Sequence, residues 1–352
     1  MQSFLSQLQK GATSFIGTNI IAVDIGTAIT RIAIFEKGVV IREPSYVGLN
    51  TKTNEYVFFG GEAKEIYGKA PNFIQIIHPM DFGIISDFDS TVKLIEHFFE
   101  KAVHPFFFKN KLLKTKFIAY TTIPSNATEV EERALEEALI KAGAGRVRIL
   151  EKSTVTGFGA GLPVFSNDPV FVIDMGAGLI EMAIIIAGGI VASKTLKLGG
   201  FHMDMVIKNY LHLKNGIIIG ENTAEKLKDD LMQFSDTKKV ATIRGKSLEN
   251  GLPRSIRVTS TDVNEALIST FNQIIDGIKD LLETIPPEVV DGIVKNGITL
   301  TGGLGNIPGI DKYIMLDIKV PVSISENPAD ATINGILKLL KDKDRLARVV
   351  IR

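Results

Sequence analysis

The chain has 352 residues, enough for about two domains, and 45% of them are hydrophobic, which is enough to build large cores. Its 40 basic and 40 acidic residues give a formal net charge of zero, so no electrostatic excess drives nucleic-acid binding, and we expect no nucleic-acid partner. With no cysteine, the chain has no disulfide framework, thiolate nucleophile or Cys-ligated metal centre, which fits a reducing cytoplasm.

Residues 1–18 precede the first predicted strand and lack the charge pattern and apolar core of a secretory signal, so we expect them to be retained. Phe4, Leu5 and Leu8 recur at helical spacing between glutamines, which is compatible with a short amphipathic helix lying on a bilayer. The alternative, which we favour, is a frayed tail or a helix packed on its own domain. The longest apolar runs fall short of the ~20 residues that a spanning helix needs.

Two segments, residues 20–41 and 171–191, resemble each other at an offset of 150 positions. Each has an apolar run, an Asp-x-Gly followed by small residues, a second apolar run and a glycine turn, a pattern that predicts a β-hairpin. The repeat therefore predicts two similar domains. The turns align as Asp24-Ile25-Gly26-Thr27-Ala28-Ile29 and Asp174-Met175-Gly176-Ala177-Gly178-Leu179.

The two turns carry the chemistry of a phosphate site. Gly26 and Gly176 permit backbone conformations that are closed to residues with a Cβ, and they let the backbone approach a ligand closely. Successive N–H groups in such a turn bind phosphate oxygens, and an Asp at the strand end can hold Mg²⁺ directly or through water. Two turns facing each other would clamp a nucleotide tail.

Further elements follow along the chain. Residues 128–131 form a capping box that opens a helix ending at Gly143, and residues 222–225 form a box-like start of another. A longer helix is predicted from Ser260 or Thr261 to about Glu283. A predicted strand over residues 296–301 then runs into the glycine-rich segment 302–306, which resembles another ligand turn.

Three other patterns in the sequence do not match the functional motifs that they resemble. Gly245-Lys246-Ser247 ends like a P-loop, but residue 240 is Val where that loop needs Gly, so we interpret it as a hairpin turn. Residues 157–161 are glycine-rich but follow no convincing strand, and therefore open no dinucleotide-binding fingerprint. The five histidines lack the spacing of metal ligands, and surface or capping roles are expected for them.

A set of further motifs is spread over nearly the whole chain, at residues 22–30, 38–45, 61–64, 123–125, 128–133, 159–163, 223–225, 251–253, 286–288 and 300–303. Together these motifs resemble the MreB family of bacterial actins. The resemblance implies an α/β, actin-like (RNase H-like) ATPase fold, with two related domains, each with a smaller subdomain, around a cleft for ATP and Mg²⁺. The expected domains are 1–160 plus 330–352, with a small subdomain at about 48–80, and 161–329, with one at about 197–260.

The resemblance also assigns site residues by motif position. The first phosphate turn would use Gly26, Thr27, Ala28 and Ile29, and the second Gly176, Ala177 and Gly178. Asp24 and Asp174 would face the metal, Glu225 and Lys228 the nucleoside, and Gly302, Gly303 and Leu304 the adenine side.

Two departures from the family pattern concern the attacking water. Lys152 stands where the family carries a water-orienting Glu, and Leu179 stands where it carries a Thr. Because a missing general base typically costs ~10²–10⁴-fold in rate, we predict that the chain binds ATP but hydrolyses it weakly or not at all, with Lys152 pairing with the γ-phosphate. The alternative, that Glu151 shifts inward by one register and restores activity, stays open. Elsewhere, Ile29 replaces a usual Asn and Leu304 a Gly.

A possible membrane contact precedes the predicted strand near residue 117, where the family carries a membrane-touching loop. It contains aromatic and apolar residues flanked by lysines, namely Phe106, Phe107, Phe108, Leu112 and Leu113. The phenylalanines could equally plug into the domain core, and both interpretations stay open.

The resemblance implies a protein that polymerises, in paired protofilaments, into filaments on the inner face of the cytoplasmic membrane. We therefore expect a cytoplasmic, peripheral membrane protein that serves cell shape or filament-based motility, with itself and actin paralogues as partners. One alternative is a nucleotide-bound partner of paralogues that does not polymerise alone. Another is a kinase-like or chaperone-like enzyme of the same superfamily, for which no substrate motif or peptide-binding domain is evident.

Overall fold

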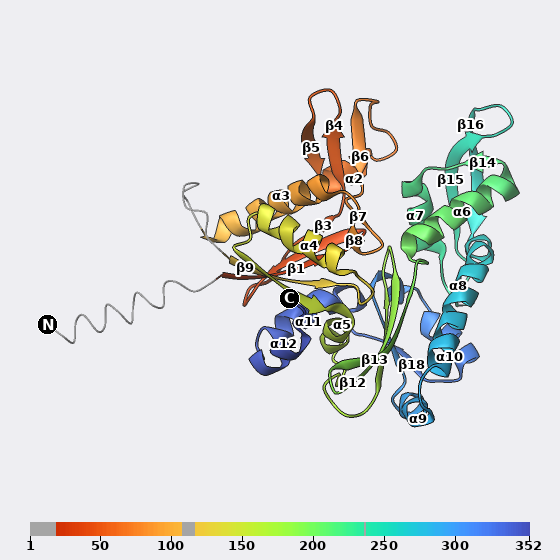
Figure 1. Ribbon diagram of the computed structural model, residues 1–352. Coiled ribbons are helices and arrows are strands. Elements are labelled where there is room, and N and C mark those ends of the chain that lie inside the picture. The colour runs from red at the N-terminus through yellow and green to blue at the C-terminus, as the bar shows by residue number, and fades with distance from the viewer. Residues whose placement is uncertain (1–18, 108–116, 236) are drawn as a thin grey trace, which may run out of the picture.

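The computed structural model describes residues 19–107, 117–235 and 237–352, which form two lobes standing side by side (Figure 1). Each lobe is built on a five-stranded sheet, and each carries a three-stranded sheet at its tip. Helices pack on these sheets, as an α/β fold requires. Among the described residues, no helix combines the length and the apolar character needed to cross a membrane.

The two large sheets have the same topology. In each, the first strand pairs antiparallel with the hairpin strand that follows it and parallel with a strand from much later in the chain. The predicted repeat is therefore visible in the strand order. The first sheet runs β10 (Arg146–Glu151), β9 (Phe117–Ile123), β1 (Asn19–Ile25), β2 (Ile29–Ile34), β3 (Gly38–Pro44). The second runs β18 (Val322–Ile324), β17 (Ile298–Thr301), β11 (Val170–Met175), β12 (Ile180–Ile186), β13 (Gly189–Leu196).

The two small sheets form the upright tips of the lobes in Figure 1. A short hairpin, β7 and β8, leads from the first tip back toward the space between the lobes. The first tip holds β4 (Val47–Asn50), β5 (Glu55–Phe59), α2 (Gly61–Ile66) and β6 (Ile74–Ile77), followed by β7 (Met80–Asp81) and β8 (Ile84–Ile85). The second holds α6 (Gly200–Asn215), β14 (Ile217–Ile218), α7 (Glu221–Leu231), β15 (Val240–Ser247) and β16 (Pro253–Thr259).

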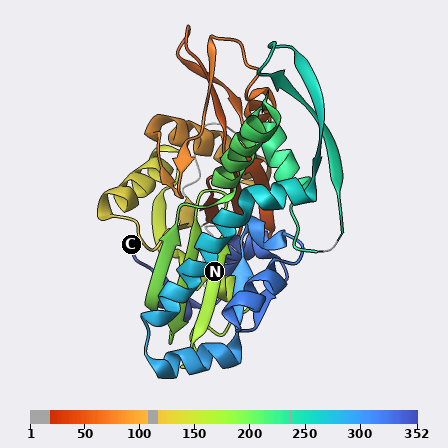
Figure 2. The same cartoon turned by 90° about the vertical axis from the view of Figure 1, so that its right-hand side faces the viewer.

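Apolar helix faces cover the large sheets and form the cores. Phe98 on α3 and Val23 on β1 are buried together in the first lobe, and Phe271 on α8 and Ile173 on β11 in the second. Figure 2 shows α8 lying over one face of the second sheet. The helices are α3 (Phe88–Phe107), α4 (Glu129–Lys141), α5 (Lys152–Gly159), α8 (Ser260–Glu283), α9 (Pro287–Asn296), η1 (Gly303–Asn306), α10 (Ile310–Ile318), η2 (Pro328–Asp330), α11 (Ala331–Leu339) and α12 (Lys343–Val349).

Helices α5 and α11 cross in direct backbone contact near the base of the space between the lobes. A Cβ on Gly159 would lie 1.8 Å from the carbonyl oxygen of Ala331, and one on Gly335 would lie 2.0 Å from that of Val155. Both positions therefore have room only for glycine. The segment 157–161, which we expected to follow no strand, lies at the end of α5, and its Gly159 serves this crossing.

Two local predictions are wrong. Helix α7 begins at Glu221 after Gly220, without a side-chain cap, so Asn222 lies inside the first turn and does not cap it. Residues 245–247 belong to β15, where Gly245 and Lys246 pair with β16, and the hairpin turn comes after them. The long helix α8 has the predicted bounds.

Of the membrane candidates, residues 1–18, Phe108, Leu112 and Leu113 lie outside the described residues, as do the side chains of Phe106 and Phe107 at the end of α3.

The predicted capping box at α4 is present. Thr128 Oγ1 accepts a hydrogen bond from Glu131 N at 3.4 Å, and the Glu131 carboxylate accepts one from Thr128 N at 2.6 Å. Thr128→Ala should lower the free energy of unfolding by about 1 kcal/mol, since an N-cap loss has this cost, and chemical denaturation would measure it. Thr128→Ser keeps the hydroxyl and should match the unaltered chain; equal losses in both variants would contradict the capping role.

Candidate functional site: a cleft between two glycine turns

The two Asp-x-Gly turns have the same internal hydrogen bond. Gly26 N donates to the carbonyl oxygen of Ile29 at 3.1 Å, and Gly176 N donates to that of Leu179 at 2.8 Å. Neither glycine takes the left-handed conformation, contrary to our expectation of a special backbone conformation. The requirement is steric instead, because a Cβ on Gly26 would lie 2.6 Å from the Ile29 oxygen. The first turn thus excludes a side chain at Gly26, and the second leaves little room at Gly176, where a Cβ would lie 3.1 Å from the Leu179 oxygen.

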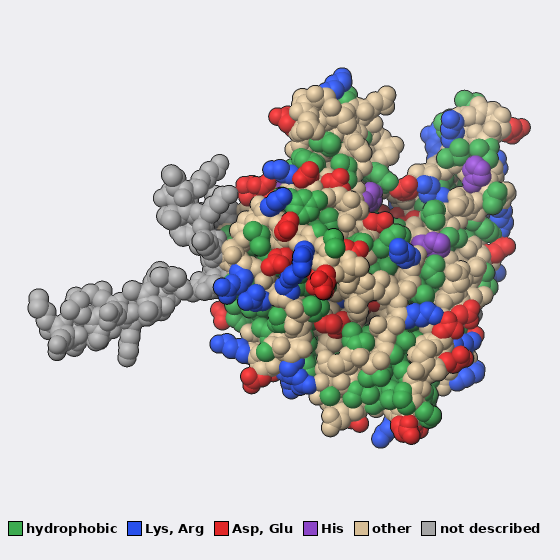
Figure 3. Space-filling view, viewed as in Figure 1, with side chains coloured by type: hydrophobic (Ala, Val, Ile, Leu, Met, Phe, Trp, Pro, Cys, Tyr) green, Lys and Arg blue, Asp and Glu red, His purple; other side chains and the backbone are tan. Residues whose placement is uncertain are grey.

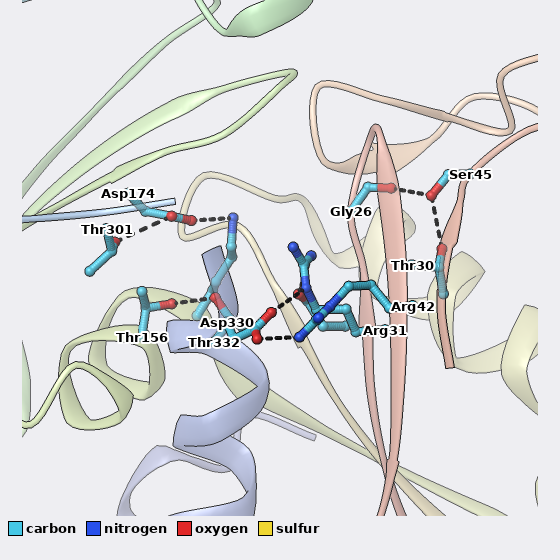
Figure 4. Close-up of polar contacts among 12 residues, drawn as sticks. Gly26, Thr30, Arg31, Arg42, Ser45, Thr156, Asp174, Thr301, Asp330 and Thr332 are labelled. Carbon is cyan, nitrogen blue, oxygen red and sulfur yellow. Dashed lines mark hydrogen bonds and ion pairs between the residues drawn. The ribbon is translucent and has the colours of Figure 1, made fainter. Parts of the chain in front are cut away.

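The first turn is also held from behind. Ser45 Oγ donates to the carbonyl oxygen of Gly26 at 2.7 Å and lies 2.9 Å from Thr30 Oγ1, as Figure 4 shows. Thr30 and Ser45 are fully buried. Their hydroxyls satisfy each other and fix the carbonyl of the turn, which leaves the N–H side of the turn toward the cleft.

The turns of the two lobes touch. A Cβ on Gly178 would lie 2.4 Å from Thr27 Oγ1, so the second turn must carry glycine at position 178, where the first turn carries Ala28. Gly83, in the β7–β8 turn, donates its N–H to the same Thr27 oxygen at 3.1 Å. Both turns line one pocket. Its other walls include Asp24, Asp174, Lys152, Gly302 and Gly303.

A second pocket opens beside the first. Ala177 and Gly303 line both, so the two pockets adjoin. Glu225 and Lys228 of α7 and Leu304 of η1 line the second pocket. The structure therefore brings the residues expected around the phosphates and those expected around the nucleoside into one cleft.

Glu225 and Lys228 of α7 already have partners. The buried Lys228 ammonium lies 2.8 Å from Asp204 and donates to the carbonyl oxygen of Gly200 at 3.2 Å. Burial raises the pKa of the Asp204 carboxyl to about 6, although Lys228 opposes this shift. Glu225 pairs at 2.8 Å with Lys64, which belongs to α2 of the other lobe.

The Lys64–Glu225 pair is one of several contacts that join the two lobes, whose tips stand apart in Figure 3. The hydroxyl of Tyr67 donates to Glu221, and the rings of His78 and Phe201 meet edge to face at 5.5 Å. The sequence analysis missed these residues, because contacts across more than a hundred positions leave no periodic signal.

Four carboxylates and three cations are gathered around the phosphate pocket. Lys152, the first residue of α5, places its ammonium 3.0 Å from Asp174 and also pairs with Glu181. Burial opposes the charged form, but Glu181 and Asp174 outweigh it and raise the pKa of Lys152, so this side chain is a buried ammonium. Burial also raises the pKa of Glu181 and of Asp24.

At Asp24, on the first sheet, the cation is an arginine. The Arg31 guanidinium lies 3.5 Å from Asp24 and donates to Asp330 at 2.9 Å. Figure 4 shows Arg42 reaching the same Asp330 carboxylate. Sequence analysis missed Arg31 and Glu181, although the repeat carries a signal for both, since they too are 150 positions apart.

The residues expected to govern the attacking water lie in different surroundings. Leu179 is buried and lines the phosphate pocket together with Lys152 and Ile29. Glu151 caps α5, where its carboxylate accepts hydrogen bonds from Ser153 N at 2.9 Å and Thr154 N at 2.7 Å. The Ser125 hydroxyl donates to it as well, at 2.9 Å. Glu151 is thus committed to the helix terminus.

Two related α/β lobes around a cleft of paired glycine turns define an actin-like protein. Residues 18–348 match the family model described as MreB/Mbl protein, and the chain belongs to that family of bacterial actins. It is 35% identical over 331 residues to the cell shape-determining protein Mbl of Bacillus subtilis, covering 93% of this chain and 97% of Mbl.

Solved structures agree with this membership. The crystal structure of MreB5 of Spiroplasma citri bound to ADP superposes with a TM-score of 0.87 at 30% identity, covering 94% of this chain and 98% of MreB5. The same protein has been solved bound to AMPPNP, with the same TM-score. The MamK double helical filament, at 20% identity and a TM-score of 0.76, covers 93% of this chain and 99% of the MamK chain, and shares the fold.

Proposed function

We propose that the chain is an ATP-binding bacterial actin that polymerises into filaments at the inner face of the cytoplasmic membrane and hydrolyses ATP weakly or not at all. The observation that carries the proposal is the pair of matched glycine turns that line one pocket, which adjoins a second. The ADP and AMPPNP bound to S. citri MreB5 support nucleotide binding here. The Mbl and MamK relationships support a role in cell shape and self-association, and filament-based motility is the related alternative.

Weak hydrolysis is proposed from the groups that surround the pocket. Hydrolysis of a phosphoanhydride needs a positioned water and a group that orients it. Lys152 is a cation and cannot accept the proton of that water, and Leu179 offers it no hydrogen bond. For Glu151 to substitute, its carboxylate would have to give up three hydrogen bonds at the start of α5.

A Mg²⁺ ion held by Asp24 and Asp174 does not fit the residues present. Each carboxylate already faces a cation of the chain, Arg31 for Asp24 and Lys152 for Asp174. Within the described ranges, no three His, Asp or Glu side chains are grouped closely enough to hold a metal ion. We therefore assign no step to a divalent ion at these aspartates and propose ATP alone as the ligand.

The proposed partners are further copies of this chain, in paired protofilaments, and paralogous actins. The runner-up is a nucleotide-bound partner that does not polymerise alone. Sedimentation at high speed distinguishes them: with ATP, the chain proposed here pellets by itself and stays in the pellet as long as it does with AMPPNP, because slow hydrolysis preserves the ATP state. A chain that binds ATP but stays in the supernatant would support the runner-up.

Gly178→Ala tests the site itself. The added Cβ would displace Thr27 and force the two turns apart. We expect ATP affinity, measured by fluorescent-nucleotide displacement, to fall at least about tenfold, since overpacking costs ~1–3 kcal/mol. Gly189→Ala on β13, where the nearest atom to the new Cβ is 3.7 Å away, is the matched control and should bind like the unaltered chain. Equal affinity in both variants would place the nucleotide elsewhere.

A further inference from the structure

Two carboxylates lie directly opposite each other at the edge of the phosphate pocket. Asp174 on β11 is in register with Glu181 on β12, and Glu181 is only 4% exposed. Like charges at paired positions of a sheet destabilise it, and a buried charge needs a partner of opposite sign. Lys152 supplies that partner to both, lying 3.0 Å from Asp174 and in an ion pair with Glu181.

In the first lobe, the charge of the corresponding aspartate is compensated by a residue on the neighbouring strand. Asp24 on β1 is in register with Arg31 on β2, so the strand neighbour itself provides the cation. In the second lobe the equivalent neighbour is Glu181, and the cation comes from the start of α5 instead. Asp24 and Asp174, near the ends of β1 and β11, are thus each paired with a cation of the chain.

Lys152 is also placed to meet a ligand. It lines the phosphate pocket together with both glycine turns. An ammonium has three N–H donors, and two carboxylates use two of them, which leaves one for a phosphate oxygen. A hydrogen bond between charged groups of this kind is among the strong ones. A divalent ion at Asp174 would have to approach this ammonium against like-charge repulsion and would deprive Glu181 of its only ion-pair partner among the described residues.

We propose that Lys152 is a resident cation that takes the place of a divalent ion beside Asp174, so that this chain binds the triphosphate of a nucleotide without requiring Mg²⁺. The proposal rests on the proposed function, because it assumes that the cleft binds ATP. It goes further in assigning to one side chain the neutralising role of the metal, with Glu181 as the residue that positions it.

The test compares ATP affinity of the full chain in excess Mg²⁺ and in excess EDTA at matched ionic strength, by calorimetry or fluorescent-nucleotide displacement. The unaltered chain should show dissociation constants within about threefold of each other, since its own charge-assisted contact replaces the metal. Lys152→Gln combined with Glu181→Gln removes one charge of each sign and leaves Asp174 free. This double variant should bind ATP at least about tenfold more tightly with Mg²⁺ than with EDTA.

Two further variants keep the test decisive. Lys194→Gln with Asp280→Asn removes an exposed ion pair of the same lobe and should behave like the unaltered chain. Lys152→Arg keeps the positive charge and should stay independent of Mg²⁺. Thermal denaturation checks that each variant is folded, and the measurement on the unaltered chain needs no variant at all.

Each outcome has one meaning. If the unaltered chain loses tenfold or more in affinity with EDTA, the inference is wrong while the proposed nucleotide binding stands. If the double variant is as independent of Mg²⁺ as the unaltered chain, Lys152 is not the cation responsible, and the inference is wrong again. If the unaltered chain binds no ATP under either condition, the proposed function itself fails.

Discussion

The unaltered chain should release phosphate from ATP at a rate close to background, even at concentrations that favour assembly, and Lys152→Glu with Leu179→Thr should release it about 10²-fold faster or more. The substitutions give the attacking water a carboxylate that accepts its proton and a hydroxyl that positions it. Phosphoryl transfer depends mainly on such positioning and on charge stabilisation. Phosphate release measured beside B. subtilis Mbl under identical conditions would check both halves of the prediction.

Control variants distinguish the two groups that could act as the general base, Glu151 and the glutamate introduced at position 152. Glu151→Gln should leave the slow rate of the unaltered chain unchanged, because Glu151 is engaged with Ser125 and the first turn of α5. Release at the rate of Mbl, abolished by Glu151→Gln, would mean that Glu151 leaves the helix terminus and serves as the base. A folded double variant no faster than the unaltered chain would show that the water is governed by other groups.

The repeat explains why so much of the fold follows from the sequence. Hairpins set by local alternation and a turn glycine are short-range features, so β1–β2 and β11–β12 are found where the Asp-x-Gly motifs predict them. The capping box at Thr128 fixes the start of α4 for the same reason. The start of α7 is missed because Asn222-Thr223-Ala224-Glu225 matches a capping box locally, whereas the helix begins two residues earlier, with Gly220 as its N-cap.

The charges of the site are a different matter. The sequence analysis pointed Lys152 at a phosphate, whereas in the structure its ammonium is engaged by Asp174 and Glu181. Glu181 could have been predicted beside Asp174 from the sequence, because the hairpin register places position 181 opposite position 174 just as it places 31 opposite 24. The contact between Lys64 and Glu225 could not have been predicted in this way, since it depends on how two separate tips meet.

Lys152→Met should be among the most destabilising single substitutions in the chain. It leaves the buried Glu181 and the half-buried Asp174 without their cation, and breaking a buried pair in this way costs about 3–5 kcal/mol of unfolding free energy. Urea denaturation would measure the loss. Lys194→Met removes the exposed partner of Asp280 and should cost less than about 1 kcal/mol. Losses of similar size at both positions would contradict a special role for the buried ammonium.

The pH dependence of this loss identifies its cause. Burial raises the pKa of the Glu181 carboxyl, and without Lys152 nothing nearby opposes that shift, while the Asp174 charge adds to it. The folded variant then holds a proton that the unfolded chain releases near pH 4–5, so its stability falls as pH rises and recovers as pH falls. The deficit of Lys152→Met should therefore shrink between pH 7 and pH 5, and adding Glu181→Gln should remove most of that pH dependence. A deficit that is constant over this range would point to lost packing of the lysine stem instead of an uncompensated charge.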